Sequence, residues 1–225
     1  MLALLLASSL TGAAPPTEAV DRIRAWVGAS ATEPAGYDAM ADCMGPRAPY
    51  RTRVAFRRSD LWARMVQWHG DAQTWDAVAR GTSSWAVDDA GKWTAGDSSV
   101  LAGVIGHQFL AMVLAPEKIF RELAPGRKEQ FEGQDVQWFI GTEIAGTPIE
   151  LAIESTGRPI ALRLQRGGKI GTLLVRWSDW RRIGTVRLPM AVQIDQGKDI
   201  FRFRFRTPRL EPPSDAGWTP AGSAR

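Results

Sequence analysis

SSVLAGVIGHQFLAMVLAP, residues 98–116, is the long apolar segment of this 225-residue chain, and strand-like sequence lies on both sides of it. Ser98 or Ser99 can cap a helix at its start, and Pro116 stops it. The segment is apolar nearly all round but shorter than the roughly 20 residues that span a bilayer, which favours a buried helix. A second short helix is predicted for residues 117–123.

The sequence around this segment alternates with a period of two, as half-buried strands do. In DIFRFRFR (199–206), Phe201, Phe203 and Phe205 point one way and the arginines point the other way. Comparable strands are predicted at about 50–57, 61–69, 73–80, 83–88 and 91–94 before the helices, and at 136–140, 150–154, 160–164, 172–177 and 186–195 after them. An amphipathic helix is expected at 17–28, and residues 29–49 read as an irregular connection.

Helices that are segregated from two blocks of strands predict an α+β domain with an antiparallel sheet. We expect a strongly curved sheet, that is, an open and incomplete β-barrel, with the helices covering its concave face. One domain is expected over residues 15–213, followed by a flexible tail at 214–225.

Residues 1–14, MLALLLASSLTGAA, are apolar and end in small residues, which is typical of a secretory signal peptide. A buried N-terminal helix is the alternative for this segment. No Cys follows the apolar stretch, so a lipid anchor is not expected. The sequence predicts an exported, soluble protein of the periplasm of a Gram-negative envelope, and we expect a monomer.

The composition is poor in reactive groups, with two His, one Cys and ten Trp, and the net charge is +4. A single Cys forms no internal disulfide, and two His cannot build a three-histidine zinc site. No nucleophile, zinc or phosphate-binding motif occurs in the chain. His69, His107 and Cys43 are expected to be structural, so we predict no enzyme, no catalytic residue, no metal and no cofactor.

The apolar faces of the predicted strands could enclose a cavity for an acyl chain or another lipid. A filled core is the alternative that the pattern leaves open. Helix 98–116 could close over the cavity as a lid, because Gly103 and Gly106 allow close approach. The predicted cavity residues are Val54, Phe56, Trp138, Ile140, Leu151, Ile153, Leu162, Leu164, Phe201, Phe203 and Phe205. The predicted lid residues are Leu101, Val104, Ile105, Phe109 and Met112.

The arginines of the same strands offer a second hypothesis. They would form a basic outer surface, which is either a solvated strand face or a site for an anionic membrane surface or an envelope protein. This hypothesis describes a non-catalytic interaction module of the cell envelope with a filled core. No nucleic-acid partner is expected for an exported chain. The arginines are Arg51, Arg53, Arg57, Arg202, Arg204 and Arg206.

Two pairs of motifs resemble the periplasmic lipoprotein carriers of the LolA/LolB-like superfamily. FRRSDLWARM (56–65) with ARGTSSWAVD (79–88) is similar to their strand–turn–strand and Gly-Lys/Arg-Thr-x-x-Trp hairpin. WSDWRRIGTVRLPMAVQID (177–195) with FRFRFRTPRLEPP (201–213) is similar to the last strands of outer-membrane lipoprotein-sorting-like members. The resemblance covers roughly residues 50–213.

The resemblance implies an open barrel capped by helices, with an apolar cavity for lipid-modified cargo. It also implies a latch, a strand-end arginine that holds the lid helices closed. Arg58 matches this position and Arg57 is its rival, while Ser59 stands where the carriers commonly have Pro. The predicted function is therefore a carrier or binding protein for an acyl chain, a lipid or a lipid-modified protein.

Overall fold

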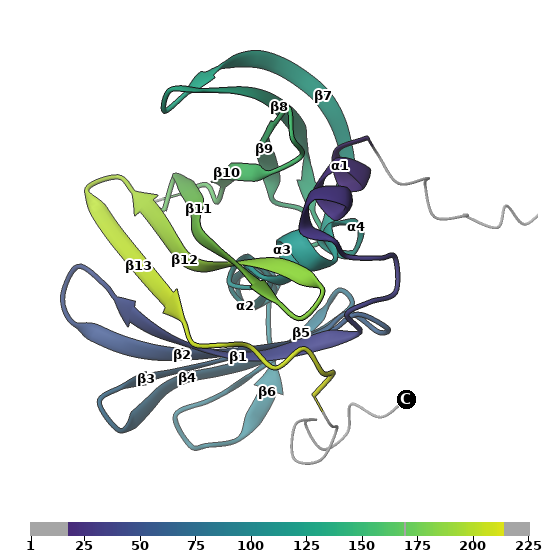
Figure 1. Cartoon of the computed structure of the whole chain (residues 1–225). Coiled ribbons are helices and arrows are strands. Elements are labelled where there is room, and N and C mark those ends of the chain that lie inside the picture. Colours follow the sequence, from purple (N-terminus) through teal and green to yellow (C-terminus); the bar gives the residue numbers. More distant parts are fainter. Residues whose placement is uncertain (1–17, 169, 214–225) are drawn as a thin grey trace, which may run out of the picture.

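The computed structural model describes residues 18–168 and 170–213, so the predicted signal peptide and the predicted tail lie outside the described residues. Within these residues the strands form one antiparallel sheet of 13 strands (Figure 1). The helices are α1 (Glu18–Val27), α2 (Ser98–Gly106), α3 (Ala111–Leu114) and α4 (Pro116–Ile119). The strands are β1 (Gly36–Met44), β2 (Pro49–Arg57), β3 (Trp62–His69), β4 (Ala72–Arg80), β5 (Ser83–Val87), β6 (Trp93–Ala95), β7 (Phe120–Phe131), β8 (Gln134–Glu143), β9 (Pro148–Glu154), β10 (Pro159–Gln165), β11 (Thr172–Ile183), β12 (Val186–Gln196) and β13 (Asp199–Phe205).

The pairing of β1 with β13 joins the two predicted blocks of strands into one sheet. The strand order is β6-β5-β4-β3-β2-β1-β13-β12-β11-β10-β9-β8-β7, so every neighbour except β1 and β13 is also a neighbour in sequence. In the junction Cys43 faces Phe203 and Ala41 faces Phe205. The first strand of the chain and the last one therefore lie side by side in the middle of the sheet.

The helices lie against one face of the sheet, where they build the main core. Figure 1 shows them in the centre of the view, between β1–β6 and β7–β9. Helix α2 contacts β3, β4 and β5, whereas α1 contacts β7 and β12. The apolar side chains of α1, with Val20 and Ile23 fully covered, and of the 101–119 segment join the inward side chains of the sheet in one cluster.

The expected antiparallel sheet with segregated helices is confirmed, but its expected shape is corrected. The domain is mostly β, and the sheet is neither closed nor strongly curled. The two edge strands, β6 and β7, do not pair with each other, and the helical segment α2–α4 connects them. The helices between the two edge strands are short, and the bending of the sheet around the core is spread over its 13 strands.

Two strands, β1 and β7, were not predicted from the sequence. Strand β1 occupies part of the predicted irregular connection, since the inward side chains that follow Tyr37 are the small Ala39, Ala41 and Cys43 and give a weak apolar signal. Strand β7 replaces the end of the helix predicted at 117–123. It contains Pro125 and Gly126, which an edge strand tolerates because one row of its backbone groups pairs with nothing.

The long apolar segment is not one helix but two. Asp97 caps α2, because its carboxylate accepts from the backbone N–H groups of Ser99 (2.8 Å) and Val100 (3.1 Å), so the expected Ser98 or Ser99 cap is wrong. The helix ends at Gly106. The buried amide of Gln108 then donates to the carbonyl of Arg64 (3.2 Å) and accepts from the Tyr37 hydroxyl (2.7 Å), and these bonds hold the chain in an irregular turn.

Candidate functional site

A pocket of about 1060 Å³ opens at the end of the sheet where the β1–β2, β10–β11 and β12–β13 turns lie. Its floor and walls come from α2, from the 145–148 turn before β9, and from β10–β13. Ligand pockets in proteins have volumes of roughly 300–1,000 Å³, so its size suits a lipid-sized molecule.

One wall of the pocket is apolar and belongs to the sheet. Since successive side chains of a strand point to opposite faces, alternate residues of four adjacent strands reach the pocket together. Phe201 and Phe203 of β13 stand beside the aliphatic side chains of its neighbours. The aliphatic members of this wall are Leu164, Leu173, Val175 and Ile194.

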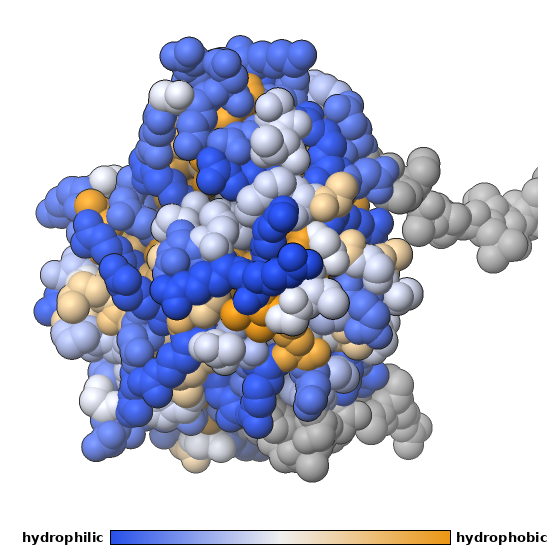
Figure 2. All heavy atoms as spheres, in the orientation of Figure 1, coloured by the Kyte–Doolittle hydropathy of each residue, from blue (hydrophilic) through white to orange (hydrophobic). Residues whose placement is uncertain are grey.

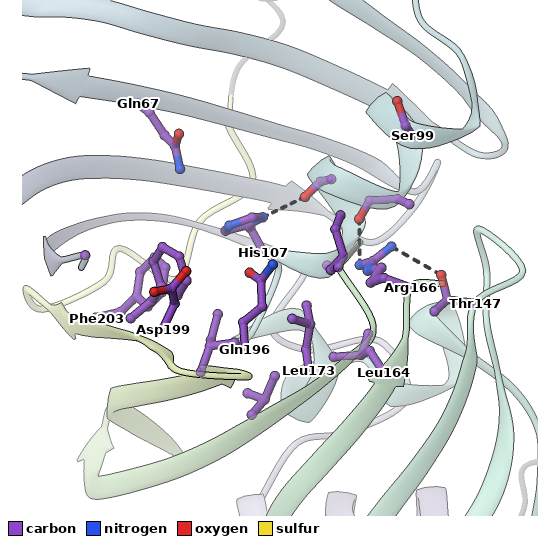
Figure 3. A pocket seen from close by; sticks show the side chains of 18 of the residues that line it. Gln67, Ser99, His107, Thr147, Leu164, Arg166, Leu173, Gln196, Asp199 and Phe203 are labelled. Carbon is purple, nitrogen blue, oxygen red and sulfur yellow. Dashed lines mark hydrogen bonds between the residues drawn. The ribbon is translucent and has the colours of Figure 1, made fainter. Parts of the chain in front are cut away.

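The opposite wall carries α2 and a set of polar side chains. Helix α2 turns its small residues to the pocket, namely Ser99, Ala102, Gly103 and Gly106, whose spacing of three and four places them on one helix face. Figure 3 shows the polar side chains around this wall. They are Gln67, Ser99, His107, Thr147 and Arg166, while Gln196 belongs to the sheet wall, on the same face of β12 as Ile194.

Arg166 connects the pocket wall to α2. Its Nη2 donates to the carbonyl oxygen of Ala102 (2.8 Å), and its Nη1 lies 3.1 Å from the Glu143 carboxylate and 3.2 Å from the Thr147 hydroxyl (Figure 3). A Cβ at Gly106 would collide with the guanidinium of Arg166. The bare backbone of Gly106 is therefore what lets Arg166 lie against the helix.

Glu143 is the buried counter-ion of Arg166. The Thr147 hydroxyl donates to its Oε1 (2.5 Å), while its Oε2 is buried without a hydrogen-bond partner in the described structure. Burial raises the pKa of Glu143, and the nearby Arg166 and Thr147 oppose this rise only in part. The carboxyl is thus fixed in place with one oxygen lacking a hydrogen bond, so Glu143 is the less well compensated partner of the ion pair.

His107 is neutral and has a defined tautomer. Its Nδ1 lies 2.8 Å from the carbonyl oxygen of Gly103. A carbonyl only accepts, so Nδ1 carries the proton and Nε2 is left as a hydrogen-bond acceptor. Burial, and to a smaller extent the charge of Arg166, lowers the pKa of His107 to about 4. The pocket wall therefore offers an acceptor nitrogen beside the Phe203 ring, whose centroid is 6.1 Å from that of the imidazole.

Arg58 lies at the other end of the sheet and contacts other helices. Its Nη2 donates to the carbonyl oxygen of Leu114 at the end of α3, and its Nη1 donates to that of Ser30 (3.0 Å). Its Nε is 3.4 Å from Glu117 of α4, whose carboxylate also pairs with Arg24 (2.9 Å). Strand β2 has nine residues, so about 30 Å separates this cluster from the β1–β2 turn at the pocket.

The rival candidate for the latch, Arg57, has a local partner. Its guanidinium binds both carboxylate oxygens of Asp60 in the β2–β3 turn, at 2.7 and 2.8 Å. Among the two candidates only Arg58 has a described bond to a helix between β6 and β7. Arg58 is the candidate whose guanidinium bonds to the helical segment, at the carbonyl of Leu114.

The structure divides the predicted cavity residues into three groups. Leu164, Phe201 and Phe203 line the pocket. Trp138 and Ile140 lie on the opposite face of the sheet, which corrects their predicted place. The others share the inner face but fill the core; they are Val54, Phe56, Leu151, Ile153, Leu162 and Phe205.

Strand β8 explains the misplaced pair, because both of its faces are apolar. Phe139 points to the main core, and its register partner is Leu151. Trp138 therefore points outward, where the guanidinium of Arg163 covers its ring at 4.1 Å. Ile140 shares that face and is 49% exposed. Alternation within β8 shows which side chains share a face of the strand, but it does not show which of the two faces points to the main core.

The predicted lid residues are buried and do not line the pocket. Leu101, Val104 and Ile105 form the face of α2 that packs on the core, while Phe109 and Met112 lie beyond the end of this helix and are also buried. The helix lines the pocket with its small residues instead. Gly103 and Gly106 on this face were expected from the sequence, but Arg166 was not; its signal is a basic residue between an apolar strand and a glycine-rich turn.

The predicted basic surface is largely neutralised. Four of its six arginines form ion pairs with aspartates, which lowers the net charge of this face. The pairs are Arg51–Asp71 (3.5 Å), Arg53–Asp38 (2.6 Å), Arg57–Asp60 (2.7 Å) and Arg206–Asp42 (2.9 Å). Arg202 and Arg204 have no ion pair among the described residues.

Other reactive groups of the described residues show little arrangement for chemistry. Cys43 is buried on β1, and burial raises the pKa of its thiol to about 12. No cluster of three metal-binding side chains occurs in residues 18–168 and 170–213. In that same part of the chain, none of the helices is long and apolar enough to span a membrane.

Neither a family model nor a curated protein matches this chain by sequence. Solved structures do match it in fold. A LolA superfamily protein from Nitrosomonas europaea superimposes with a TM-score of 0.64 at 10% identity, over 89% of this chain and 96% of that one. An outer membrane lipoprotein-sorting protein domain from Vibrio parahaemolyticus gives 0.58 at 13% identity, over 85% and 90% of the two chains.

A DUF1329 family protein from Desulfovibrio piger also matches, with a TM-score of 0.56 at 9% identity over 90% of this chain and 94% of that one. At these identities the likeness establishes the fold and nothing more. The chain has the fold of LolA superfamily proteins, as the resemblance of its motifs predicted.

Proposed function

We propose that this protein is a periplasmic binding or carrier protein for an acyl chain, a lipid or a lipid-modified protein. The observation that carries the proposal is the pocket of about 1060 Å³ with an apolar sheet wall, in a chain that has the LolA superfamily fold. One matching structure is named for lipoprotein sorting, which supports a lipid-modified cargo among these choices. The signal-peptide-like residues 1–14 support export.

The two walls of the pocket favour an amphiphilic ligand over a plain hydrocarbon. The phenylalanines and aliphatic residues of β10–β13 would bury the acyl chain, and burial of apolar surface would supply affinity of about 25 cal/mol per Å². The acceptor Nε2 of His107 and the amides of Gln67 and Gln196 would bind a hydroxyl, ester or amide group of the ligand. A chain without polar groups would leave them unpaired.

Movement of α2 would widen the pocket for entry and exit of the ligand. Arg166 is the side chain that ties the pocket face of this helix to the sheet, and Arg58 ties α3 and α4 to it at the far end. We assign Arg58 the role of the latch that holds the helical segment in place. Arg166 would act as a second tie, next to the ligand.

Native mass spectrometry of the purified protein, combined with organic extraction and analysis of the lipids, tests the proposal. We expect a bound amphiphile, or stoichiometric uptake of a fluorescent fatty acid after its removal. The substitution Leu173→Trp fills the apolar wall and should abolish uptake. The control Ile140→Trp adds the same ring to the exposed opposite face and should leave uptake unchanged. Uptake that persists in Leu173→Trp would contradict a site in this pocket.

A further inference from the structure

The rim of the pocket concentrates exposed apolar side chains. Four large apolar residues of the described chain are conspicuously exposed, and three of them lie at this end of the sheet: Met44 (50%), Ile170 (48%) and Ile200 (37%). The fourth is Ile140, on the far strand β8. Exposed apolar groups gathered in one place mark an interaction site more often than scattered ones do.

The pairing of the strands places these residues next to one another. Met44 is the last residue of β1, and its register partner on β13 is Arg202. Ile200 lies two residues before Arg202 on the same face of β13, so Met44 and Ile200 are diagonal neighbours. Ile170 belongs to the β10–β11 turn and lines the pocket itself. Met44 and Ile200 thus lie on the outer face of β1 and β13, opposite the pocket-lining Phe203, and Ile170 lies at the mouth; all three belong to the end of the sheet at which the pocket opens.

Basic side chains surround the same rim. Arg47 in the β1–β2 turn and Lys198 in the β12–β13 turn are exposed and line the mouth, and Arg202 stands between Met44 and Ile200. None of the three has an ion pair within the described residues. In Figure 2 the edge of the molecule where these hairpins end shows orange and pale atoms between blue ones.

The acidic groups near the rim are mostly engaged elsewhere. Asp42 pairs with Arg206 (2.9 Å), and Asp195 pairs with Arg176 (2.5 Å). Asp199 is the acidic residue of the rim without an ion pair in the described part of the chain. Three unpaired cations against one unpaired carboxylate leave the rim positively charged.

We propose that this rim, made of Met44, Arg47, Ile170, Lys198, Ile200 and Arg202, docks the protein on a lipid bilayer that contains anionic phospholipids. The inference rests on the proposed function, because it names the surface from which the pocket loads or onto which it unloads. The cations would contact lipid phosphates, and the apolar side chains would enter the headgroup region. The mouth would then face the bilayer, and an acyl chain could pass without crossing water.

The small size of the rim fits a carrier that must leave the membrane again. Few side chains enter the bilayer, so docking should be weak, reversible and sensitive to salt. Each cation that is lost from a surface near anionic lipid weakens binding about five-fold. The apolar residues should determine whether the protein remains bound at high ionic strength.

Sedimentation with vesicles tests the inference. The probes are vesicles of pure phosphatidylcholine and vesicles that also contain phosphatidylglycerol. We expect the wild-type protein to bind the second kind and to be released by salt. Arg202→Gln should weaken this binding about five-fold, and Met44→Ser/Ile200→Ser should weaken it ten-fold or more. These three residues do not line the pocket, so uptake of the fluorescent fatty acid in solution should stay unchanged.

Matched controls lie at the other end of the sheet and on its far part. Arg182→Gln removes an exposed cation without an ion pair in the described structure, near the β11–β12 turn, and Ile140→Ser removes the fourth exposed apolar side chain. Both should bind vesicles as the wild type does. Equal losses in the controls and in the rim variants would overturn the inference.

The remaining outcomes separate the rim from the pocket. A wild-type protein that takes up the fatty acid but binds neither vesicle would overturn membrane docking and leave the pocket standing; a partner protein would then be the occupant of the rim. A protein that binds phosphatidylglycerol vesicles through the rim without any fatty-acid uptake would support the docking surface and contradict the pocket.

Discussion

Two arginines at strand ends, Arg58 and Arg166, each donate a hydrogen bond to a helix carbonyl, but their surroundings differ. Arg58 binds Leu114 of α3 within a buried cluster with Arg24 and Glu117. Arg166 binds Ala102 of α2 and faces the pocket. The first therefore closes a filled core, whereas the second borders an open space.

The difference indicates which part of the helical segment can move. To release α3 and α4, the protein would have to separate Arg24 and Arg58 from Glu117 and also expose the fully buried apolar side chains of α3 to water. To release α2, it would have to break the Arg166 contacts beside the pocket and expose the three core side chains Leu101, Val104 and Ile105, whereas the other face of this helix already borders the pocket. We therefore expect α2 to be the mobile part of the lid and α3 with α4 to be its fixed base.

The largest expected effect follows from removal of the fixed tie. Arg58→Met should lower the free energy of unfolding by about 3–5 kcal/mol, because Glu117 then remains buried with less compensation. Urea denaturation measures this. The neighbouring Arg57→Met removes a partly exposed pair with Asp60 and should cost about 1 kcal/mol or less. If both variants lose the same stability, the buried cluster has no special role.

Acidification should act on the pocket end through His107. Its pKa is lowered from 6.5 to about 4, so the folded protein binds fewer protons than the unfolded chain within this window. Stability is therefore lost progressively as the pH falls below 6.5, by at most about 3 kcal/mol for this group. The loss is complete below pH 4, where both states are protonated.

The substitution His107→Gln isolates this contribution. It removes the titrating group and keeps a polar side chain at the pocket wall. The difference in unfolding free energy between the wild type and this variant should change between pH 6.5 and pH 4 and stay constant above pH 7. A difference that is constant over the whole range would mean that the imidazole is not desolvated.

Removal of the second tie should affect ligand exchange more than stability. Arg166→Met should cost about 1–3 kcal/mol, because Glu143 can take up a proton instead of staying charged, and its pKa is already raised. Release of the fluorescent fatty acid, measured by stopped flow, should become faster by roughly ten-fold, as one or two hydrogen bonds are lost.

A double variant sharpens this prediction. Arg166→Met combined with Glu143→Gln should be more stable than Arg166→Met alone, while release stays fast. Recovery of slow release in the double variant would contradict a tie between Arg166 and α2.

The smallest change in stability is expected at Gly106. Alanine at this position favours the helix by up to about 1 kcal/mol, but its Cβ would displace the flexible end of Arg166. The two effects oppose each other, so Gly106→Ala should change the unfolding free energy by less than about 1 kcal/mol. It should nevertheless speed up release, as Arg166→Met does. Unchanged release would show that Arg166 can bind Ala102 from another position.

Much of the fold was readable from the sequence because local alternation carries it. Helix α1, the strands between residues 49 and 95, and those between 134 and 205 were expected within a few residues, except that β11 continues to Ile183 beyond its predicted end at 177. The inward row Phe201, Phe203 and Phe205 was also correct, since its other face is entirely charged or exposed. Where both faces of a strand are apolar, as in β8, the pattern does not show which face points inward, and the predicted inward face was wrong.

The misses have a common origin in contacts between distant residues. Strand β1 has small inward side chains after Tyr37 and is held by β2 and β13, which pair with it from both sides. The break after Gly106 depends on Gln108, which bonds to residues more than 40 positions away. In neither case does the local sequence differ enough from the sequence around it to predict the strand or the break.

The sequence by itself determined a chain poor in reactive groups, built of alternating strands with an apolar helical segment between them, because such periodicities depend on near neighbours. Only the tertiary structure decided where the interior stays open. That depends on which face of α2 carries the small residues. It also depends on the contact of Arg166 with α2 and on the contact of His107 with Phe203 of β13. A cavity exists where side chains from distant elements do not fill the space between them, and no single stretch of sequence records that.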